Sequence, residues 1–373
     1  MSPDAVLTRL ARLPAARLWL RPLALLSGPD AAAAIAAARA HPLAGDALAF
    51  GAAEVLALGE GGYLAAALPL PALRGWAEAA GRAVADRIAE LLAALAAPRA
   101  VWAGLPLDRP RIMGVVNVTP DSFSDGGDFA DPARAIAAGR AMLAAGADII
   151  DVGGESTRPG AAPITPEEER RRVEPVVEAL AAAGALVSID TRHASVMAAA
   201  LARGARIVND VTALTGDPAA RATAAKAGAA VVLMHMQGEP RTMQRDPSYV
   251  SAPIEVTEYL AARIADCLAA GIARDRIVVD PGIGFGKTLE HNLDILARLA
   301  LLHGLGCGVL LGASRKSFIG GVTGAAVPKE RLPGSLAAAL YGVAQGVHIL
   351  RVHDVAETRQ ALAVWRGIAE ARR

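Results

Sequence analysis

A unit of a helix followed by a buried strand recurs along the chain from residue 112 onward. In several copies a glycine separates an alanine-rich amphipathic stretch from a short run of apolar, β-favouring residues, as at Gly146, Gly184, Gly204 and Gly228. Glycine after the last helical turn is a favoured helix stop. Strands that are apolar on both faces and alternate with helices are typical of a parallel sheet covered by helices. The repeat therefore restricts this part of the chain to α/β folds.

The number of strands distinguishes an open sheet from a closed barrel. We expect strands at residues 112–119, 148–154, 186–190, 206–211, 230–235, 277–282, 309–314 and 348–354. Eight strands in roughly 260 residues is the size of a (β/α)8 TIM barrel. An open doubly wound sheet more often has about five or six strands and a glycine-rich first turn, and no such turn follows the first strand here. The sequence predicts a TIM barrel over residues 106–373.

Three helix starts can be read from residues that cap helices. Asp131 and Asp217 each precede a proline, which suits the first helical position because its missing N–H would be unpaired there anyway. Thr165 is followed three positions later by Glu168, which predicts a capping box. We therefore expect helices to begin directly after these three residues.

Residues 1–105 do not join the repeat. They contain two apolar stretches, 18–26 and 47–58, and a pattern that predicts one helix from about residue 76 to 97. The proline-containing segment that follows reads as a connector. We interpret residues 1–105 as a small α/β appendage of unknown role, for which packing or an oligomer contact is a better explanation than a second active site.

The charge balance and the cysteines limit the partners and the compartment. With 38 basic and 37 acidic side chains the chain has no net field to hold a polyanion, so nucleic acid is not expected as a partner. Cys267 and Cys307 lack metal-ligand spacing and are expected to be free thiols in a reducing cytoplasm. Arginines interrupt the apolar N-terminal stretch, so neither a signal peptide nor a membrane span is expected.

Most of the expected strands end in polar residues. This matters because the active site of a TIM barrel lies at the carboxyl ends of its strands. The polar strand-end residues are Asn117, Asp151, Asp190, Asn209, Asp210, Asp280, Ser314, Arg315, Lys316, Ser317, Arg351, His353 and Asp354. A single aspartate at such a place is more often a structural cap, but their convergence on one mouth indicates a common site.

The residue types at this mouth suggest the chemistry of the ligand. Aspartate and asparagine side chains can pair with the ring N–H groups and nitrogens of a flat, nitrogen-rich heterocycle. Arg351, His353, Lys316 and Arg158 can bind a phosphate or a carboxylate. The sequence contains no cluster of histidines and cysteines, so a zinc site is not expected. Mg²⁺ held mainly by substrate phosphates is compatible with the sequence.

Two other motifs point to weaker hypotheses. The segment PGIGFGKT resembles a phosphate-binding P-loop, but only three residues separate Gly282 from Gly286 where the motif needs four. His235, between two methionines on an apolar strand, could be a ligand. A hydrogen-bonded histidine in the core or wall is the better interpretation there.

Eight strings in this order resemble the signatures of the dihydropteroate synthase family. They are NVTPDSFSDGG, DVGGESTRPGA, SIDT, IVNDV, LMHMQG, DPGIGFGK, SRKSFIG and RVHDV, and they extend over about residues 111–370. The resemblance implies an enzyme that condenses a dihydropterin methyl diphosphate with 4-aminobenzoate, releasing pyrophosphate. It also implies Mg²⁺ as cofactor and a homodimer.

The resemblance implies roles for individual residues. The pterin ring would contact Asp190, Asn209, Val211, Met234, Asp280, Phe285, Lys316 and Arg351. Pyrophosphate would bind Asn117, Arg351 and His353, with Mg²⁺ at Asn117. 4-Aminobenzoate would lie near Thr157, Arg158, Pro159, Phe285, Ser314 and Lys316, beneath the loops 119–127 and 156–161. The chemistry would fall on Asp190, Asp280, Lys316, Arg351 and His353, and the role of the matching Asp151 stays open.

Two alternatives share the ring-binding residues. One is a methyltetrahydrofolate-dependent methyltransferase, which would not need the cations of SRKS and RVHD. The other is a pterin-binding barrel without catalysis, which would not need the long loops after the first two strands. The N-terminal hundred residues are the main departure from the family pattern, and Ile283 replaces a residue that is often bulkier in the family.

Overall fold

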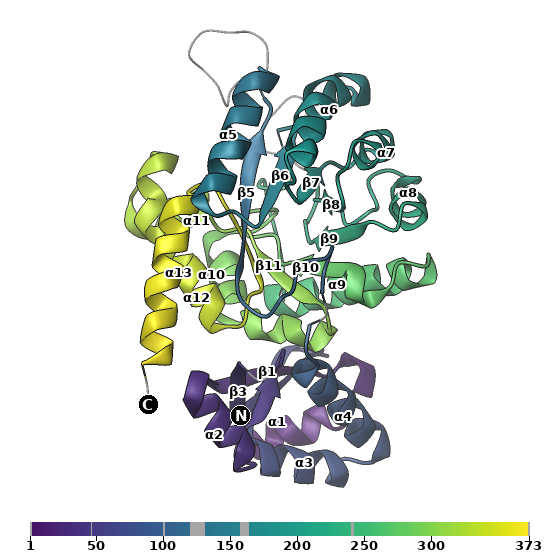
Figure 1. Ribbon diagram of the computed structural model, residues 1–373. Coiled ribbons are helices and arrows are strands. Elements are labelled where there is room, and N and C mark those ends of the chain that lie inside the picture. The colour runs from purple at the N-terminus through teal and green to yellow at the C-terminus, as the bar shows by residue number, and fades with distance from the viewer. Residues whose placement is uncertain are drawn as a thin grey trace.

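The computed structural model describes residues 2–45, 47–99, 101–119, 131–156, 164–239 and 242–371. These residues form a small N-terminal part with an antiparallel sheet and a larger barrel surrounded by helices (Figure 1). Among the described residues, no helix combines the length and the apolar character needed to cross a membrane. Cys267 and Cys307 are both buried and unpaired, as the sequence predicts.

Eight parallel strands close into a barrel, which confirms the predicted (β/α)8 architecture. The order around the barrel is β10-β11-β12-β5-β6-β7-β8-β9. The strands are β5 (Arg111–Asn117), β6 (Ile149–Gly153), β7 (Val187–Asp190), β8 (Ile207–Asp210), β9 (Ala230–Met234), β10 (Ile277–Asp280), β11 (Gly308–Leu311) and β12 (Ile349–Val352). Every residue of β6, β8, β9, β10 and β11 is buried. Burial on both faces explains why the strands read as unbroken apolar runs.

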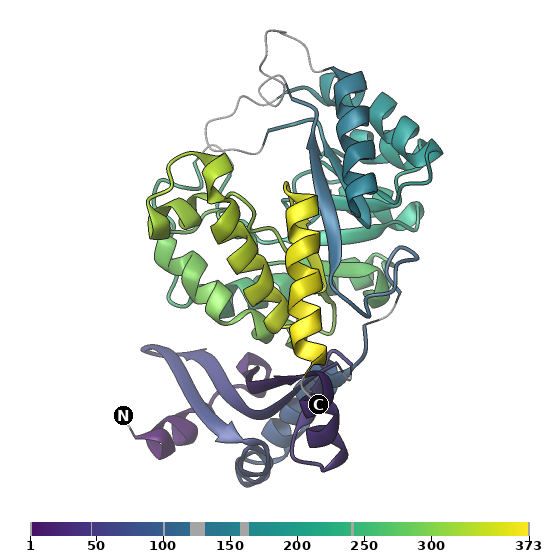
Figure 2. The same ribbon diagram turned by 60° about the vertical axis from the view of Figure 1, so that its left-hand side comes forward.

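Helices alternate with these strands and form the outer layer (Figures 1 and 2). They are α5 (Pro132–Ala145), α6 (Pro166–Ala182), α7 (Ala194–Ala202), α8 (Ala220–Lys226), α9 (Ala252–Ala269), α10 (Leu289–Ala297), α11 (Ser317–Thr323), α12 (Leu332–Ala344) and α13 (Val355–Glu370). Short 3₁₀ turns η3 (Arg274–Arg276), η4 (Leu299–Leu305) and η5 (Pro328–Arg331) lie between them. Each strand therefore ends in a loop at one common end of the barrel.

The predicted helix starts are right in two cases of three. The side chains of Asp131 and Thr165 each accept a backbone N–H of the first turn, at 2.9 and 3.2 Å. The Glu168 carboxylate does not complete a capping box, because it binds two arginines of the same helix. The prediction for Asp217 was wrong, because α8 begins at Ala220. The Asp217 carboxylate accepts the Ala219 backbone N–H at 2.9 Å and the first backbone N–H of α7 at 2.8 Å.

The N-terminal part is an antiparallel sheet with helices. Its elements are α1 (Pro3–Leu10), η1 (Ala15–Arg17), β1 (Trp19–Ser27), α2 (Gly28–Ala36), β2 (His41–Leu43), β3 (Leu48–Gly59), β4 (Gly62–Pro69), α3 (Leu70–Ala79) and α4 (Arg82–Ala96). The central strand β3 pairs with β1, β2 and β4. The two apolar stretches of the sequence form β1 and β3.

Two features of the N-terminal part differ from the expectation. The single helix expected over 76–97 is two helices, α3 and α4, separated at Gly81, whose φ of 105° no helix accommodates. Strand β4 was not predicted, because its alanine-rich sequence lacks the β-branched residues that mark strands. It forms a strand because it continues directly from β3 by a hairpin turn between Gly59 and Gly62.

The N-terminal part packs against the amino end of the barrel. The Arg99 guanidinium donates to the carbonyl oxygen of His303 at 3.0 Å. Gly304 lies against Leu91 and Trp19, and Gly28 lies against the last turn of α13. The residues that it contacts precede β11 or end α13, so the N-terminal part lies opposite the carboxyl ends of the strands (Figure 2).

The connector before β5 closes the amino end of the barrel. Trp102 is 1% exposed and belongs to an interior cluster with residues of several strands, among them Met113, Ile149 and Val278. Its indole N–H donates to the carbonyl oxygen of Arg276 at 2.9 Å. The amino end of the barrel is therefore filled, and a ligand can reach the interior only from the carboxyl end.

Candidate active site at the carboxyl end of the barrel

Arg351 joins two aspartates that come from other strands. Its Nε donates to Asp151 Oδ2 at 2.7 Å, and its Nη2 donates to Asp190 Oδ2 at 2.7 Å. The same Asp151 oxygen accepts a hydrogen bond from Asn209 Nδ2 at 3.0 Å. Side chains of β6, β7, β8 and β12 thus meet at one end of the barrel, as the strand-end pattern predicts.

Asp280 and Lys316 form a second group beside the first. Asp280, at the end of β10, accepts the backbone N–H of Gly282 at 2.7 Å. Lys316 Nζ donates to the carbonyl oxygen of Ile283 and lies 4.4 Å from the centre of the Phe285 ring. A cation over an aromatic face is attracted to it, and more strongly when both are shielded from water. The turn after β10 and the segment after β11 are therefore held together across the mouth.

Burial raises the pKa values of the two aspartates Asp190 and Asp280 and lowers the pKa of Lys316. The pKa of Asp190 is raised to about 7, chiefly by burial and also by the neighbouring carboxylates Asp151, Glu169 and Asp210, while Arg351 opposes the shift. Burial also raises the pKa of Asp280. The pKa of Lys316 is lowered to about 8, first by burial and then by repulsion from Arg351. Charges this close to their titration points are typical of functional sites.

The remaining predicted residues lie around this centre. Ser314 Oγ is 3.1 Å from His353 Nδ1 and also accepts the His353 backbone N–H. Val211 and Met234 are buried after β8 and at the end of β9. Asn117 ends β5, where its backbone is in register with Gly153.

Part of the predicted 4-aminobenzoate site cannot be placed. Thr157, Arg158 and Pro159 lie outside the described residues, as do most of the two loops expected to cover that ligand. Glu155, which directly precedes this segment, forms two hydrogen bonds of 3.0 Å with Arg192 after β7. The described part of the loop after β6 is thus tied to the loop after β7.

Asp210 shows that a polar strand end is not always part of the site. It is fully buried and accepts hydrogen bonds from the backbone and hydroxyl of Thr212, both at 2.7 Å, and from the Leu214 backbone at 3.0 Å. These bonds fold the segment after β8. The structural-cap interpretation therefore holds for Asp210, whereas its neighbour Asn209 contacts the Arg351 centre.

Two of the charged strand-end residues received no predicted role in binding a ligand. Arg315 forms an ion pair with Asp354 that connects the segments after β11 and β12. Its φ of 60° is a left-handed conformation unusual for a side chain of this size, and it turns the chain between Ser314 and Lys316. Both residues lie within four positions after a strand end, which was the available signal. The sequence does not show that Arg315 pairs with Asp354, because closure of the barrel brings the two segments together.

His235 and Lys287 are buried together and contact each other. His235 is 5% exposed, and its Nδ1 lies 2.9 Å from Lys287 Nζ, so it is a buried, hydrogen-bonded histidine as expected. Lys287, the lysine of the P-loop-like segment, is 3% exposed. Because its amine faces His235 rather than a loop of free backbone N–H groups, the segment is not arranged as a phosphate-binding loop.

A cavity of about 760 Å³ lies at the amino end of the barrel. Its lining includes Val101 and Gly104 of the connector and the exposed cations Arg206, Lys226 and Arg276. No predicted site residue lines it. The buried charges with shifted pKa values lie at the opposite mouth, and we place the candidate site there.

The chain belongs to the pterin-binding enzymes, since the model of the family described as "Pterin binding enzyme" matches residues 113–353. Within that family it belongs to the dihydropteroate synthases. It is 50% identical over 279 residues to the dihydropteroate synthase of Neisseria meningitidis serogroup B, which covers 72% of this chain and 98% of the relative.

Solved structures give the same result. The Xanthomonas albilineans dihydropteroate synthase with 4-aminobenzoic acid is 48% identical, with a TM-score of 0.68, and the match covers 71% of this chain and 96% of that one. A structure of that enzyme in complex with 7,8-dihydropteroate has a TM-score of 0.65 at 45% identity and covers 71% and 95%. The family model begins after the connector, so the N-terminal part lies outside it.

Proposed function

We propose that the carboxyl end of this barrel joins 4-aminobenzoate to the methylene carbon of a dihydropterin methyl diphosphate, giving 7,8-dihydropteroate and pyrophosphate for folate biosynthesis. The observation that carries the proposal is the group in which Arg351 binds Asp151 and Asp190, with Asp280 and Lys316 beside it. The molecules named with the two Xanthomonas albilineans structures are a substrate and the product of this reaction.

The polar strand ends suit the edge of the pterin ring. Asp190, Asn209 and Asp280 offer acceptors and an amide to ring N–H groups and nitrogens, and Lys316 offers a donor. Buried Met234 and Val211 and half-buried Phe285 supply apolar surfaces for the ring faces. Arg351 could stack on the ring as well as bind anions, because its guanidinium is planar.

The chemical step breaks the bond between the methylene carbon and the ester oxygen. The electron pair leaves with pyrophosphate, and the positive charge that remains spreads into the ring. Asp190 and Asp280 stabilise that charge, while Arg351 and His353 stabilise the departing anion. The amine nitrogen of 4-aminobenzoate then forms the new bond to carbon and releases a proton to solvent.

The 4-aminobenzoate would lie against the side of the mouth formed by Phe285, Ser314 and Lys316. The Lys316 ammonium and the Ser314 hydroxyl are donors suited to its carboxylate. Thr157, Arg158 and Pro159 stay predicted contacts on the opposite side. Excluding water here would protect the cation from hydrolysis.

Mg²⁺ fits the donors of this mouth in a limited way. Within the described ranges, no group of three or more histidine, cysteine, aspartate or glutamate side chains could hold a metal ion. Asn117 offers one amide oxygen at the end of β5, which suits an ion that takes most of its ligands from phosphates and water. When bound, Mg²⁺ would neutralise charge on the leaving pyrophosphate.

A pyrophosphate-release assay tests the proposal. Purified protein is incubated with Mg²⁺ and the dihydropterin methyl diphosphate, with and without 4-aminobenzoate. We expect release that depends on 4-aminobenzoate and yields 7,8-dihydropteroate. Binding of the pterin without release would instead indicate a non-catalytic pterin barrel. Methyl transfer from methyltetrahydrofolate in a parallel assay would indicate the methyltransferase alternative.

Three further assignments belong to this proposal. Residues 106–373 carry the chemistry, and residues 1–105 serve as an appendage without a catalytic role. The protein acts as a homodimer in the cytoplasm, as the family resemblance and its free thiols suggest. Light scattering on the purified chain tests the dimer, and a monomer at micromolar concentration would contradict it.

A further inference from the structure

Lys287 is a buried lysine that the proposed mechanism does not use. It follows β10 and is 3% exposed. Its Nζ lies 2.9 Å from His235 Nδ1, 2.9 Å from the Phe285 carbonyl oxygen and 3.3 Å from the His235 carbonyl oxygen. An ammonium has three N–H donors and no acceptor. Three polar atoms therefore surround this one nitrogen, while burial and repulsion from Lys316 lower the pKa of Lys287.

The histidine beside it is uncharged. Burial, with the adjacent Lys287 charge, lowers the pKa of His235 to about 3, so the imidazole is neutral at pH 7. Its ring packs edge to face on Tyr259 with centroids 4.9 Å apart, and Tyr249 packs near it and against His291. The only full charges that act on Lys287 in this surrounding, within the described residues, are those of Lys316 and Asp280.

The hydrogen-bond partners of Lys287 belong to two different loops. His235 follows β9, and Phe285 lies in the turn 282–286 after β10. That turn packs so closely on the loop after β9 that a Cβ at Gly282 would collide with the His235 carbonyl oxygen. The turn also supplies the two groups that receive Lys316, namely the Ile283 carbonyl oxygen and the Phe285 ring. Lys287 thus holds the turn that carries Phe285 and that Lys316 contacts.

Lys287 also adds a positive charge near Asp280. Burial raises the pKa of Asp280, while Lys316, the backbone N–H of Gly282, Arg351 and Lys287 act in the opposite direction. Three basic side chains, Lys316, Arg351 and Lys287, therefore oppose the effect of burial on the pKa of Asp280. Asp190 is the other carboxylate bound to Arg351.

We propose that Lys287 is a positioning residue for the pterin site: its buried amine fastens the turn 282–286 to the end of β9, behind Asp280. The proposal rests on the proposed function, because it assumes that Asp280 and Phe285 contact the pterin. A merely structural lysine would affect stability without altering the kinetics of one substrate.

The test compares Lys287→Met with Lys287→Arg and with Lys226→Met, an exposed lysine in the last turn of α8. For Lys287→Met we expect KM for the dihydropterin methyl diphosphate to rise about tenfold or more, because small displacements of positioning groups are costly. KM for 4-aminobenzoate should change much less. The acid limb of kcat/KM should move to higher pH by about one unit, because losing a nearby cation raises a carboxyl pKa.

Lys287→Arg keeps a basic side chain but cannot place one nitrogen among the same three polar atoms. We expect it to retain the acid limb of the wild type while its KM for the pterin substrate rises. It also tests the proposal if Lys287→Met does not fold. Wild-type values of KM and acid limb in folded Lys287→Met, or a wild-type KM in Lys287→Arg, would overturn the proposal. Absence of turnover by the wild type would instead count against the proposed function.

Discussion

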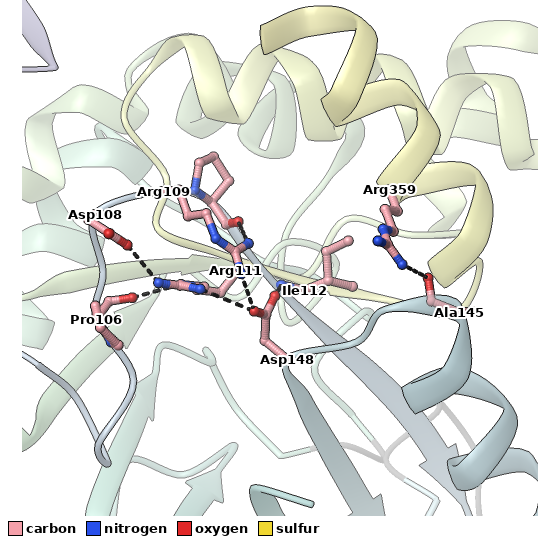
Figure 3. A network of polar contacts seen from close by, with 9 residues as sticks. Pro106, Asp108, Arg109, Arg111, Ile112, Ala145, Asp148 and Arg359 are labelled. Atoms are coloured by element: carbon pink, nitrogen blue, oxygen red, sulfur yellow. Dashed lines mark hydrogen bonds and ion pairs between the residues drawn. The ribbon is translucent and has the colours of Figure 1, made fainter.

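Asp148 and Asp151 belong to the same strand region, and both bind arginine, but they lie at opposite ends of the barrel. Asp148 precedes β6 at the amino end. Its Oδ1 accepts from Arg109 at 2.8 Å and Arg111 at 3.3 Å, and its Oδ2 accepts the Ile112 backbone N–H at 2.9 Å (Figure 3). Arg111 also donates to Asp108 and to a backbone carbonyl of the connector. These bonds fasten the connector to β5 and β6.

At the carboxyl end the charges are less well compensated. Asp151 Oδ1 is buried and has no hydrogen-bond partner within the described residues. Asp190 and Lys316 have pKa values shifted to about 7 and about 8. A buried charge without full compensation destabilises the fold, so it persists where a ligand uses it. Two clusters of aspartate and arginine thus differ in role because one has all its hydrogen-bond partners and the other does not.

The largest expected effect is on catalysis at the carboxyl end. Asp190→Asn removes a negative charge that would stabilise the cationic ring, and we expect kcat/KM to fall by about a thousandfold, or about 4 kcal/mol. Pyrophosphate release at saturating 4-aminobenzoate measures it. The midpoint of urea unfolding should not fall at pH 7. Wild-type turnover in this variant would remove Asp190 from the proposed mechanism.

The same variant shows how much the uncompensated charge affects stability. The pKa of Asp190 is raised in the folded protein to about 7 from an ordinary value of 3.8. Below about pH 4 the carboxyl is protonated in both states, and between about 4 and 7 the unfolded state ionises first, so the wild type loses stability as pH rises. We expect Asp190→Asn to become more stable relative to wild type by about 1–3 kcal/mol over this interval.

Urea unfolding at several pH values measures this difference. Asp148→Asn serves as the matched control, because no such gain is expected for a carboxylate whose oxygens are already paired. A stability difference between Asp190→Asn and wild type that does not change with pH would show that Arg351 compensates Asp190 fully. The contrast between the two ends would then lose its electrostatic basis.

The sequence predicted the barrel and the location of its mouth because both follow from local patterns. Apolar runs and glycine stops mark each strand regardless of its neighbours, and the barrel brings their ends together. The partners of Arg351 were not predictable in this way. Its bonds to Asp151 and Asp190 cross the barrel and depend on strand register. The family resemblance implied that Arg351 contacts the ring and the pyrophosphate, and its link to two carboxylates came from the structure.

The N-terminal part was harder to predict for a different reason. Its strands are rich in alanine and lack a repeat, so the sequence gave little indication of β4 and of the break at Gly81.

The environment of Lys287 could not be predicted from the sequence either. Its motif was recognised and rejected as a phosphate loop, but a buried lysine is identified only when its three acceptors, which belong to two loops, are located.

The next largest effect is on stability at the amino end. Asp148→Asn leaves Arg109 and the nearly buried Arg111 without this carboxylate, and we expect a loss of about 1–3 kcal/mol in the free energy of unfolding. Because the residue lies at the end opposite the mouth, kcat/KM should stay within about twofold of wild type. A large loss of activity in folded protein would show that the amino end is coupled to the site.

The smallest effect is expected at the edge of the same region. Arg359, on α13, donates a single hydrogen bond of 3.3 Å to the Ala145 carbonyl oxygen at the end of α5 (Figure 3). The bond is exposed and long, so Arg359→Met should change the unfolding free energy by no more than about 0.5 kcal/mol. Denaturant unfolding beside Asp148→Asn measures the ratio. If the Arg359 variant lost as much stability as the Asp148 variant, the stability of the amino end would depend on the contact between α13 and α5 rather than on the Asp148 cluster.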